Sequence, residues 1–305
     1  MKPRVFAIGE TLLDIIFENG KVIKSVPGGS VLNLAVSLGR TGLDVELISE
    51  FGSDPVGQIL RNFLQDNNVG TRWSHIHENH RSTLALAFLD ENRNASYSFY
   101  HDNLKEIKEI AVPDFKTNDI LAFGSTYSIK PERRDFLTTI LNAAKNTGTR
   151  ILYDPNIRAG QKLLNSELRE NIRQNMRIST LVKGSDEDFL SIFGADFNST
   201  LKEINGYCRN FIMTSGRKDV LLCSNGRYQT MGVPEIKPVS TIGAGDNFSA
   251  GIIYGWVQSN NSEETDSILS AGTLEILGKY GMAFSKEVCL SMENSVPVGF
   301  TPLIP

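Results

Sequence analysis

One stretch near the end of the chain combines the residue types that phosphoryl transfer needs. Gly243, Ala244 and Gly245 come directly before Asp246, and small and apolar residues follow as in a buried helix. Glycines at a helix start let successive backbone N–H groups converge, and the helix dipole adds positive potential, so this turn predicts an anion hole for a phosphate. Asp246 could accept the proton of an attacking hydroxyl. The alternative interpretation is an ordinary helix cap with an acid in its first turn.

Two other nucleotide-binding patterns are missing from the sequence. Segment 52–57 has the glycine spacing of a Walker loop, but Gln58 and Ile59 stand where that loop needs a lysine and a hydroxyl residue. No Gly-x-Gly-x-x-Gly follows the first apolar strand, which argues against a dinucleotide site.

Composition and charge exclude several classes of protein. The 305 residues are 40% hydrophobic with a net charge of −4, so a full core is expected and clustered cations for nucleic acid or anionic lipid are not. No apolar run is long enough to span a membrane, and Glu10 and Asp14 come too early for a signal peptide. Cys208, Cys223 and Cys289 form no metal or CxxC pattern, so buried or free thiols in a reducing cytoplasm are predicted.

Short apolar strands alternate with amphipathic helices along most of the chain, which is typical of a parallel α/β sheet covered on both faces. Segments 131–147 and 166–176 are expected helices. The expected strands are Val5–Ile8, Val45–Ser49, Ile120–Phe123, Ile151–Tyr153, Leu181–Val182 and Phe211–Met213.

Two segments break this alternation and read as β-hairpins. Residues 15–24 place Asn19-Gly20 between apolar runs, which is a strong hairpin signal, and residues 83–100 place a polar turn between two apolar stretches. Together they predict a small antiparallel sheet that projects from the core as a lid. The alternative is a pair of edge strands of the main sheet.

Four further motifs, taken with Thr241–Asp246, indicate a family. Ile8–Asp14 ends the first strand, Pro27–Ala35 opens a helix, Phe51–Gly57 follows the next strand, and Asp154–Arg158 ends a central strand. In this order and spacing they resemble the ribokinase-type (pfkB) carbohydrate kinases, from about residue 4 to about residue 290, and within that family the fructokinases.

The resemblance implies a three-layer α/β/α sandwich with a mostly parallel central sheet and a small antiparallel β lid. Residues 1–14, 27–82 and 101–305 would form the core, and residues 15–26 and 83–100 the lid. It further implies ATP-dependent phosphorylation of a primary hydroxyl, Mg²⁺ on the nucleotide, and a homodimer paired through the lid.

The resemblance also assigns roles to single residues. Asp246 matches the catalytic base and the turn at 243–245 the anion hole. The residues matched to substrate binding are Asp14, Gly28, Gly29, Asn33, Phe99 and Arg158; those matched to the nucleotide are Ser185, Thr214, Gly216 and Lys218. Asp14 could instead cap a turn, Phe99 could be core of a small sheet, and Arg158 and Lys218 could be surface charges.

Some positions depart from the family pattern. The motif that orders water around Mg²⁺ reads Ser185-Asp-Glu-Asp here, so either Glu187 or Asp188 would supply the carboxylate. Ser240 stands where an aspartate helps hold a monovalent cation, which leaves potassium activation open, and Asp219 replaces a usual glycine. No adenine-pocket residue is assigned. His75, His77 and His80 are expected to be surface polar residues rather than metal ligands.

The sequence therefore predicts an ATP-dependent sugar kinase whose substrate is fructose. Kinases for 2-keto-3-deoxygluconate, ribose or a nucleoside are alternatives that share the chemistry. A catalytically silent sugar-binding regulator is the alternative from a different class, and the intact Asp246 argues against it.

Overall fold

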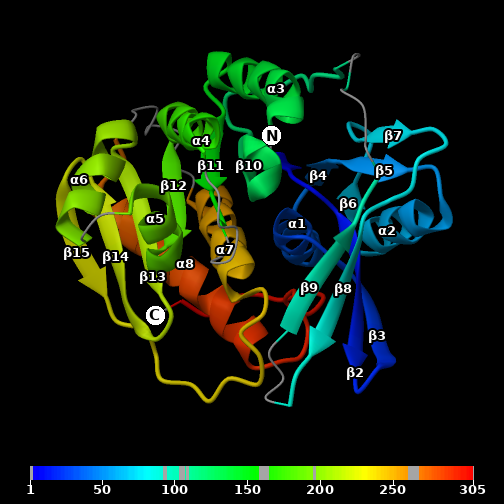
Figure 1. Cartoon of the computed structure of the whole chain (residues 1–305). Coiled ribbons are helices and arrows are strands. Elements are labelled where there is room, and N and C mark those ends of the chain that lie inside the picture. The colour runs from blue at the N-terminus through cyan, green and yellow to red at the C-terminus, as the bar shows by residue number, and fades with distance from the viewer. Residues whose placement is uncertain are drawn as a thin grey trace.

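A parallel sheet forms the centre of the molecule (Figure 1). The computed structural model describes residues 3–91, 95–102, 107, 110–157, 165–194, 197–259 and 268–304. Within these residues nine strands run in the order β15-β14-β13-β12-β11-β10-β1-β4-β6. All neighbours from β13 to β6 are parallel, and β14 and β15 continue the sheet as antiparallel strands. The strands are β1 Val5–Ile8, β4 Val45–Ile48, β6 Val69–Gly70, β10 Ile120–Gly124, β11 Arg150–Asp154, β12 Leu181–Ser185, β13 Asn210–Ser215, β14 Lys218–Ser224 and β15 Arg227–Met231.

Helices cover both faces of this sheet and complete three layers (Figure 1). One apolar core joins α1, α2, α7 and α8 to one face, and a second joins α3, α4, α5 and α6 to the other. The predicted three-layer fold is thus confirmed. The helices are α1 Ser30–Arg40, α2 Pro55–Asp66, α3 Arg134–Asn146, α4 Ser166–Ile178, α5 Asp186–Phe193, α6 Phe197–Tyr207, α7 Ala244–Gln258 and α8 Ala271–Cys289.

Burial on both faces explains why the strands are continuous apolar runs. In β1, Val5 and Ala7 belong to one core, whereas Phe6 and Ile8 belong to the other. Each large apolar side chain that leaves water in this way contributes about 1.5–3 kcal/mol. All six strands predicted from such runs are present, as β1, β4, β10, β11, β12 and β13.

A second, smaller sheet stands apart from the central one and combines the two predicted hairpins (Figure 1). Its four strands in the described residues follow the order β3-β2-β8-β9. Asn19 and Gly20 have φ of 51° and 73°, the positive values that a tight two-residue hairpin turn requires. Because the four strands form a sheet of their own, the alternative that the hairpins are edge strands of the main sheet is wrong. The strands are β2 Leu12–Glu18, β3 Lys21–Gly28, β8 Leu84–Leu89 and β9 Ala95–Tyr100.

The small sheet differs in one respect from a purely antiparallel one. Each hairpin is antiparallel, but β2 and β8 pair in parallel. These strands come from separate hairpins, so no tight turn forces them into opposite directions.

The two faces of the small sheet differ in what they carry. Asp14 pairs with Ala85, which pairs with Phe99, so an acid and an aromatic ring lie in one row on one face. The opposite face exposes the apolar side chains of Val22, Phe88 and Tyr100, which are 57%, 41% and 59% exposed. One face therefore combines an acid with exposed aromatic rings, and the other exposes apolar side chains without that acid.

A short parallel pair, β5 Glu50–Gly52 with β7 His75–His77, lies beside α2 (Figure 1). Among the described residues no helix combines the length and apolar character needed to cross a lipid bilayer.

Candidate active site

The glycine turn begins helix α7, as the sequence predicts. Gly243 precedes α7 with φ 77°, and α7 runs from Ala244. A Cβ at Gly243 would lie 2.9 Å from the backbone oxygen of Asn294, so both conformation and space call for glycine. The Asn247 side-chain amide donates to the backbone oxygens of Gly243 and Asn294, which fixes the turn against the chain that follows α8. The first backbone N–H groups of α7 are thereby held in one place.

Asp246 lies in the first turn of α7, where two side-chain amides hold its carboxylate. Asn33 Nδ2 of α1 donates to Oδ2 at 2.9 Å, and Asn156 Nδ2 donates to Oδ1 at 3.3 Å. Asn156 follows β11 with φ 42°, a left-handed conformation that turns the chain toward α7. The pattern around Asp154 contains Asn156, but sequence reasoning gave it no role.

Three of the residues matched to substrate binding meet at the base of the first hairpin. A Cβ at Gly28 would lie 2.1 Å from Asp14 Oδ2, so the carboxylate rests directly against the Gly28 backbone. Gly29 has φ +121°, and a Cβ there would lie 2.5 Å from the backbone oxygen of Glu10. Gly28 is required because Asp14 of β2 lies against its backbone. Gly29 is required because the backbone of Glu10, just before β2, lies equally close.

Two of the aromatic residues of β9, Tyr97 and Phe99, lie on the same face of the small sheet as Asp14. Phe99 is 53% exposed and stacks on Tyr97, with ring centroids 6.0 Å apart. Tyr97, which sequence reasoning did not select, lines a cavity that opens beside the glycine turn. A signal for it was the alternation in residues 96–100, which places Tyr97 and Phe99 on one face.

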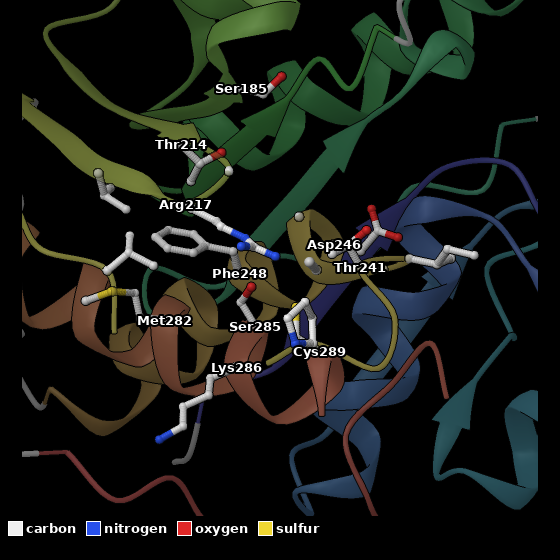
Figure 2. Close-up of a pocket in the computed structure, with 18 of the residues that line it drawn as sticks. Ser185, Thr214, Arg217, Thr241, Asp246, Phe248, Met282, Ser285, Lys286 and Cys289 are labelled. Atoms are coloured by element: carbon white, nitrogen blue, oxygen red, sulfur yellow. The ribbon is translucent and has the colours of Figure 1, made fainter. Parts of the chain in front are cut away.

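A cavity of about 950 Å³ opens beside the glycine turn (Figure 2). One part is polar and lies at the carboxyl ends of β11, β12 and β13; the other is apolar and lies between the chain after β15 and helix α8. The polar lining includes Asn156, Lys183, Ser185, Glu187, Asp188, Thr214, Gly216, Arg217, Gly243, Ala244, Gly245 and Asp246; the apolar lining includes Val220, Val233, Pro234, Ile236, Ile242, Phe248, Met282 and Cys289.

Glu187 and Asp188, the two candidate magnesium ligands of the Ser185 motif, have different surroundings. Asp188 and Ser185 form a reciprocal capping box at the start of α5, in which Asp188 Oδ2 accepts from the Ser185 backbone and hydroxyl at 2.8 and 2.7 Å. Burial raises the pKa of Asp188, with the nearby Asp154 charge acting in the same direction. Glu187 is exposed and lines the cavity. Only Glu187 of the pair therefore offers an accessible carboxylate.

The turn after β13 presents a different cation from the one that the resemblance matched. Thr214, Gly216 and Arg217 line the cavity, and Figure 2 shows the Arg217 guanidinium reaching into it. Lys218 is exposed in β14 and is not among the described residues that line the cavity. Arg158 lies outside the described residues.

A buried ion pair lies beneath the glycine turn. Lys183 Nζ donates to Asp154 Oδ2 at 2.9 Å, and the Ser249 hydroxyl of α7 donates to the same oxygen at 2.8 Å. Sequence reasoning missed Lys183, although a lysine inside the apolar run of β12 is itself a signal, because an unpaired charge is rarely buried.

A second polar cluster surrounds the buried carboxylate of Glu50. Glu50 Oε1 accepts from Arg133 Nε at 2.5 Å and from the Tyr127 hydroxyl at 2.7 Å, and Oε2 lies 2.6 Å from His77 Nε2. Burial, with the Glu50 charge, raises the pKa of Tyr127 well above its usual value. The prediction that His77 is a surface residue is wrong: it is 7% exposed, since β7 turns it toward Glu50.

Comparison with known proteins decides the family. The model of the "pfkB family carbohydrate kinase" matches residues 2–295, nearly the whole chain. The chain belongs to the pfkB family of carbohydrate kinases. It is therefore a phosphotransferase, and the resemblance in the sequence is confirmed.

Relatives and solved structures of this family agree in fold and in the type of activity. A fructokinase of Escherichia coli is 26% identical over 263 residues, covering 84% of this chain and 85% of the relative. A fructokinase of Vibrio cholerae O395 in the fructose-, ADP- and potassium-bound form has a TM-score of 0.82 at 22% identity, covering 97% of this chain and 95% of that one. An aminoimidazole riboside kinase of Salmonella enterica has a TM-score of 0.81 at 20% identity, covering 97% and 96%.

Two positions depart from the pfkB pattern without disturbing the site. Ser240 accepts a hydrogen bond from the Ile242 backbone at 3.2 Å. Asp219 lies exposed near the start of β14. Neither side chain lines the cavity in the part of the chain that the structure describes.

Proposed function

We propose that this pfkB kinase transfers the γ-phosphate of ATP to a primary hydroxyl of fructose. The observation that carries the proposal is the position of Asp246, which lies beside the first N–H groups of α7 while Asn33 and Asn156 hold both of its oxygens. Fructokinases among the relatives support fructose as the sugar. Kinases for 2-keto-3-deoxygluconate, ribose or a nucleoside are alternatives within the same chemistry.

The arrangement supports direct transfer between the two substrates. The sugar hydroxyl loses its proton to Asp246 while its oxygen bonds to the γ-phosphorus, and the bond from that phosphorus to the bridging oxygen of ADP breaks. The N–H groups of the turn at 243–245 hold the oxygens of the moving group, where charge builds up. The Ala244 N–H, which donates to the Thr241 backbone oxygen at 3.3 Å, must turn from that partner to take part. Asp14, Gly28, Gly29 and Asn33 bind sugar hydroxyls, and Phe99 with Tyr97 covers the apolar face of the sugar.

The lining of the cavity suits the two halves of a nucleotide. Ser185, Thr214, Gly216 and Arg217 line its polar part, and apolar side chains such as Val220, Ile236 and Met282 line the other. We assign phosphates to the polar part and adenine to the apolar part, with Arg217 in the role first given to Lys218.

The residues that line the polar part of the cavity suit a magnesium ion that contacts the protein through its bound water molecules. Glu187 is an exposed carboxylate that lines the cavity, whereas Asp188 is occupied by the capping box. Mg²⁺ would neutralise phosphate charge when bound to the nucleotide. We assign the outer-sphere contact to Glu187. No role for a monovalent cation is proposed, because Ser240 lacks the carboxylate that the family pattern places there.

ADP release measured with a panel of sugars, nucleosides and sugar acids tests the substrate. We expect fructose to give the highest kcat/KM, by at least about tenfold, which corresponds to roughly 1.4 kcal/mol of discrimination. Ribose or 2-keto-3-deoxygluconate ahead would overturn the sugar but keep the chemistry. Sugar binding without ADP release would favour the silent regulator.

We further propose that the small sheet acts as a lid over the core and pairs with the lid of a second chain. Support comes from its two faces: the one with Asp14 also carries Tyr97, which lines the cavity, and the other exposes Val22, Phe88 and Tyr100. Burying such a face against its copy would remove apolar surface from water. The sequence predicts a lid of residues 15–26 and 83–100. The first hairpin of the small sheet runs from Leu12 to Gly28, so we include Asp14 and Gly28 in the proposed lid.

A charge introduced on the apolar face of the small sheet should dissociate the proposed dimer into monomers. We expect Phe88→Glu to shift the mass in light scattering from dimer to monomer, because a carboxylate would be buried against apolar side chains. Glu91→Gln, an exposed change beyond the end of β8, is the control and should leave the dimer intact. A wild-type monomer at micromolar concentration would contradict the dimer.

The protein is proposed to act in the cytoplasm. Its three cysteines are buried free thiols, which suits a reducing compartment.

A further inference from the structure

Lys183 places a buried positive charge at the wall of the nucleotide cavity. The residue is 4% exposed in β12, yet it lines the cavity together with the glycine turn. Its Nζ donates to Asp154 Oδ2 of β11, and that oxygen also accepts from Ser249 of α7. Among the described residues Asp154 Oδ1 has no hydrogen-bond partner. The ammonium is therefore the main compensation for this carboxylate.

The surroundings keep Lys183 charged. Burial acts to lower the pKa of Lys183, but the carboxylate of Asp154, and more distantly those of Asp188 and Asp246, outweigh it and raise the pKa above its usual value. Such a buried pair is weak evidence for stability, because the cost of taking both charges out of water offsets most of their attraction. Stability alone does not explain the pair.

The position of the ammonium relates it to the anion hole. A Cβ built on Gly245 would lie 3.2 Å from Lys183 Nζ, so the charge rests against the backbone of the turn and glycine leaves it uncovered. The same cavity carries Asp188, Glu187 and Asp246, whose negative charges would repel a polyphosphate. Lys183 holds a positive charge against the backbone of the turn, although it shares that charge with Asp154.

We propose that Lys183 belongs to the phosphate subsite, where its ammonium, oriented by Asp154, stabilises the charge of the phosphoryl group in transfer. The proposal rests on the kinase activity proposed above. It assigns Asp154 a positioning role, through the hydrogen bond to Nζ, and it assigns Ser249 the support of Asp154.

A pair of variants separates this role from a structural one. Lys183→Met leaves Asp154 buried without its cation, so it could lose activity simply by destabilising the fold. The double variant Lys183→Met with Asp154→Asn removes both charges and keeps the shape. We expect this double variant to unfold within a few degrees of the wild type, with kcat about 10²-fold lower, the usual effect of losing one group that stabilises developing charge.

The accompanying measurements make the result specific. Asp154→Asn alone retains the ammonium and should lose less than about tenfold in kcat. Lys145→Met, at an exposed position of α3, is the control for a lost lysine. A kcat of the double variant within about threefold of wild type would overturn the proposal, since Lys183 would then only neutralise Asp154.

Nucleotide binding measured by calorimetry distinguishes this proposal from the proposed function. The double variant should bind ATP about tenfold more weakly but ADP within about threefold, because only ATP carries the phosphoryl group that Lys183 contacts. An equal loss for both nucleotides would contradict the role of Lys183. A wild-type protein that binds ATP but releases no ADP with any sugar would refute the proposed function, while the difference between ATP and ADP would still decide the role of Lys183.

Discussion

Replacing Asp246 by asparagine should lower kcat by about 10²–10⁴, the usual contribution of a general base. The carboxamide has nearly the same shape and can still accept one hydrogen bond from Asn33 or Asn156, but it cannot take the proton of the sugar hydroxyl. KM for the sugar should change by less than about threefold, because binding does not depend on that proton transfer. Steady-state ADP release at saturating ATP and sugar measures both quantities.

The control for Asp246→Asn addresses the alternative that Asp246 is an ordinary acid at a helix start. Asp135 is an exposed acid in the first turn of α3, so Asp135→Asn makes the same chemical change at a comparable place in a helix. It should leave kcat unchanged. A kcat for Asp246→Asn within about tenfold of wild type, with normal thermal unfolding, would remove Asp246 from the role of base.

Replacing Gly28 by alanine should raise KM for the sugar by about 10- to 100-fold, the effect of losing one hydrogen bond to a charged group. The new methyl group would lie 2.1 Å from Asp14 Oδ2, so the carboxylate must turn away. The catalytic groups on α7 are untouched, so kcat at saturating sugar should fall by less than about threefold. Sugar titrations at fixed ATP separate the two constants.

A second glycine provides the matched control for Gly28→Ala. Gly206 in α6 has no atom within 4 Å of its Cβ position apart from its chain neighbours and the backbone of its own helix, and it has no positive φ, so Gly206→Ala should leave KM unchanged. A KM for Gly28→Ala within about twofold of wild type would show that Asp14 does not bind the sugar.

The sequence predicted the elements that position the site because their signals are local. The apolar run of β1 and the Asn19-Gly20 turn depend only on neighbouring residues, and both appear where they were expected. The start of α7 at Ala244 likewise follows from the glycines before it. The family motifs added the order of these elements in the chain.

Contacts between distant segments could not be predicted in the same way. The hydrogen bond from Asn156 to Asp246 spans 90 positions, and that from Lys183 to Asp154 spans 29. The parallel pairing of β2 with β8 and the burial of His77 beside Glu50 also depend on how distant strands meet. The choice between Glu187 and Asp188 needed the capping box, which consumes one of two adjacent acids.

Asp14 lies within β2, so part of the proposed sugar site is built into the small sheet itself, whereas Asp246 lies on a helix of the core. A ligand that binds Asp14 therefore restrains β2. Because β2 is hydrogen-bonded to β8, the same ligand also restrains the second hairpin. By thermodynamic linkage, the affinity gained at that one carboxylate favours the arrangement in which the whole sheet covers the bound molecule.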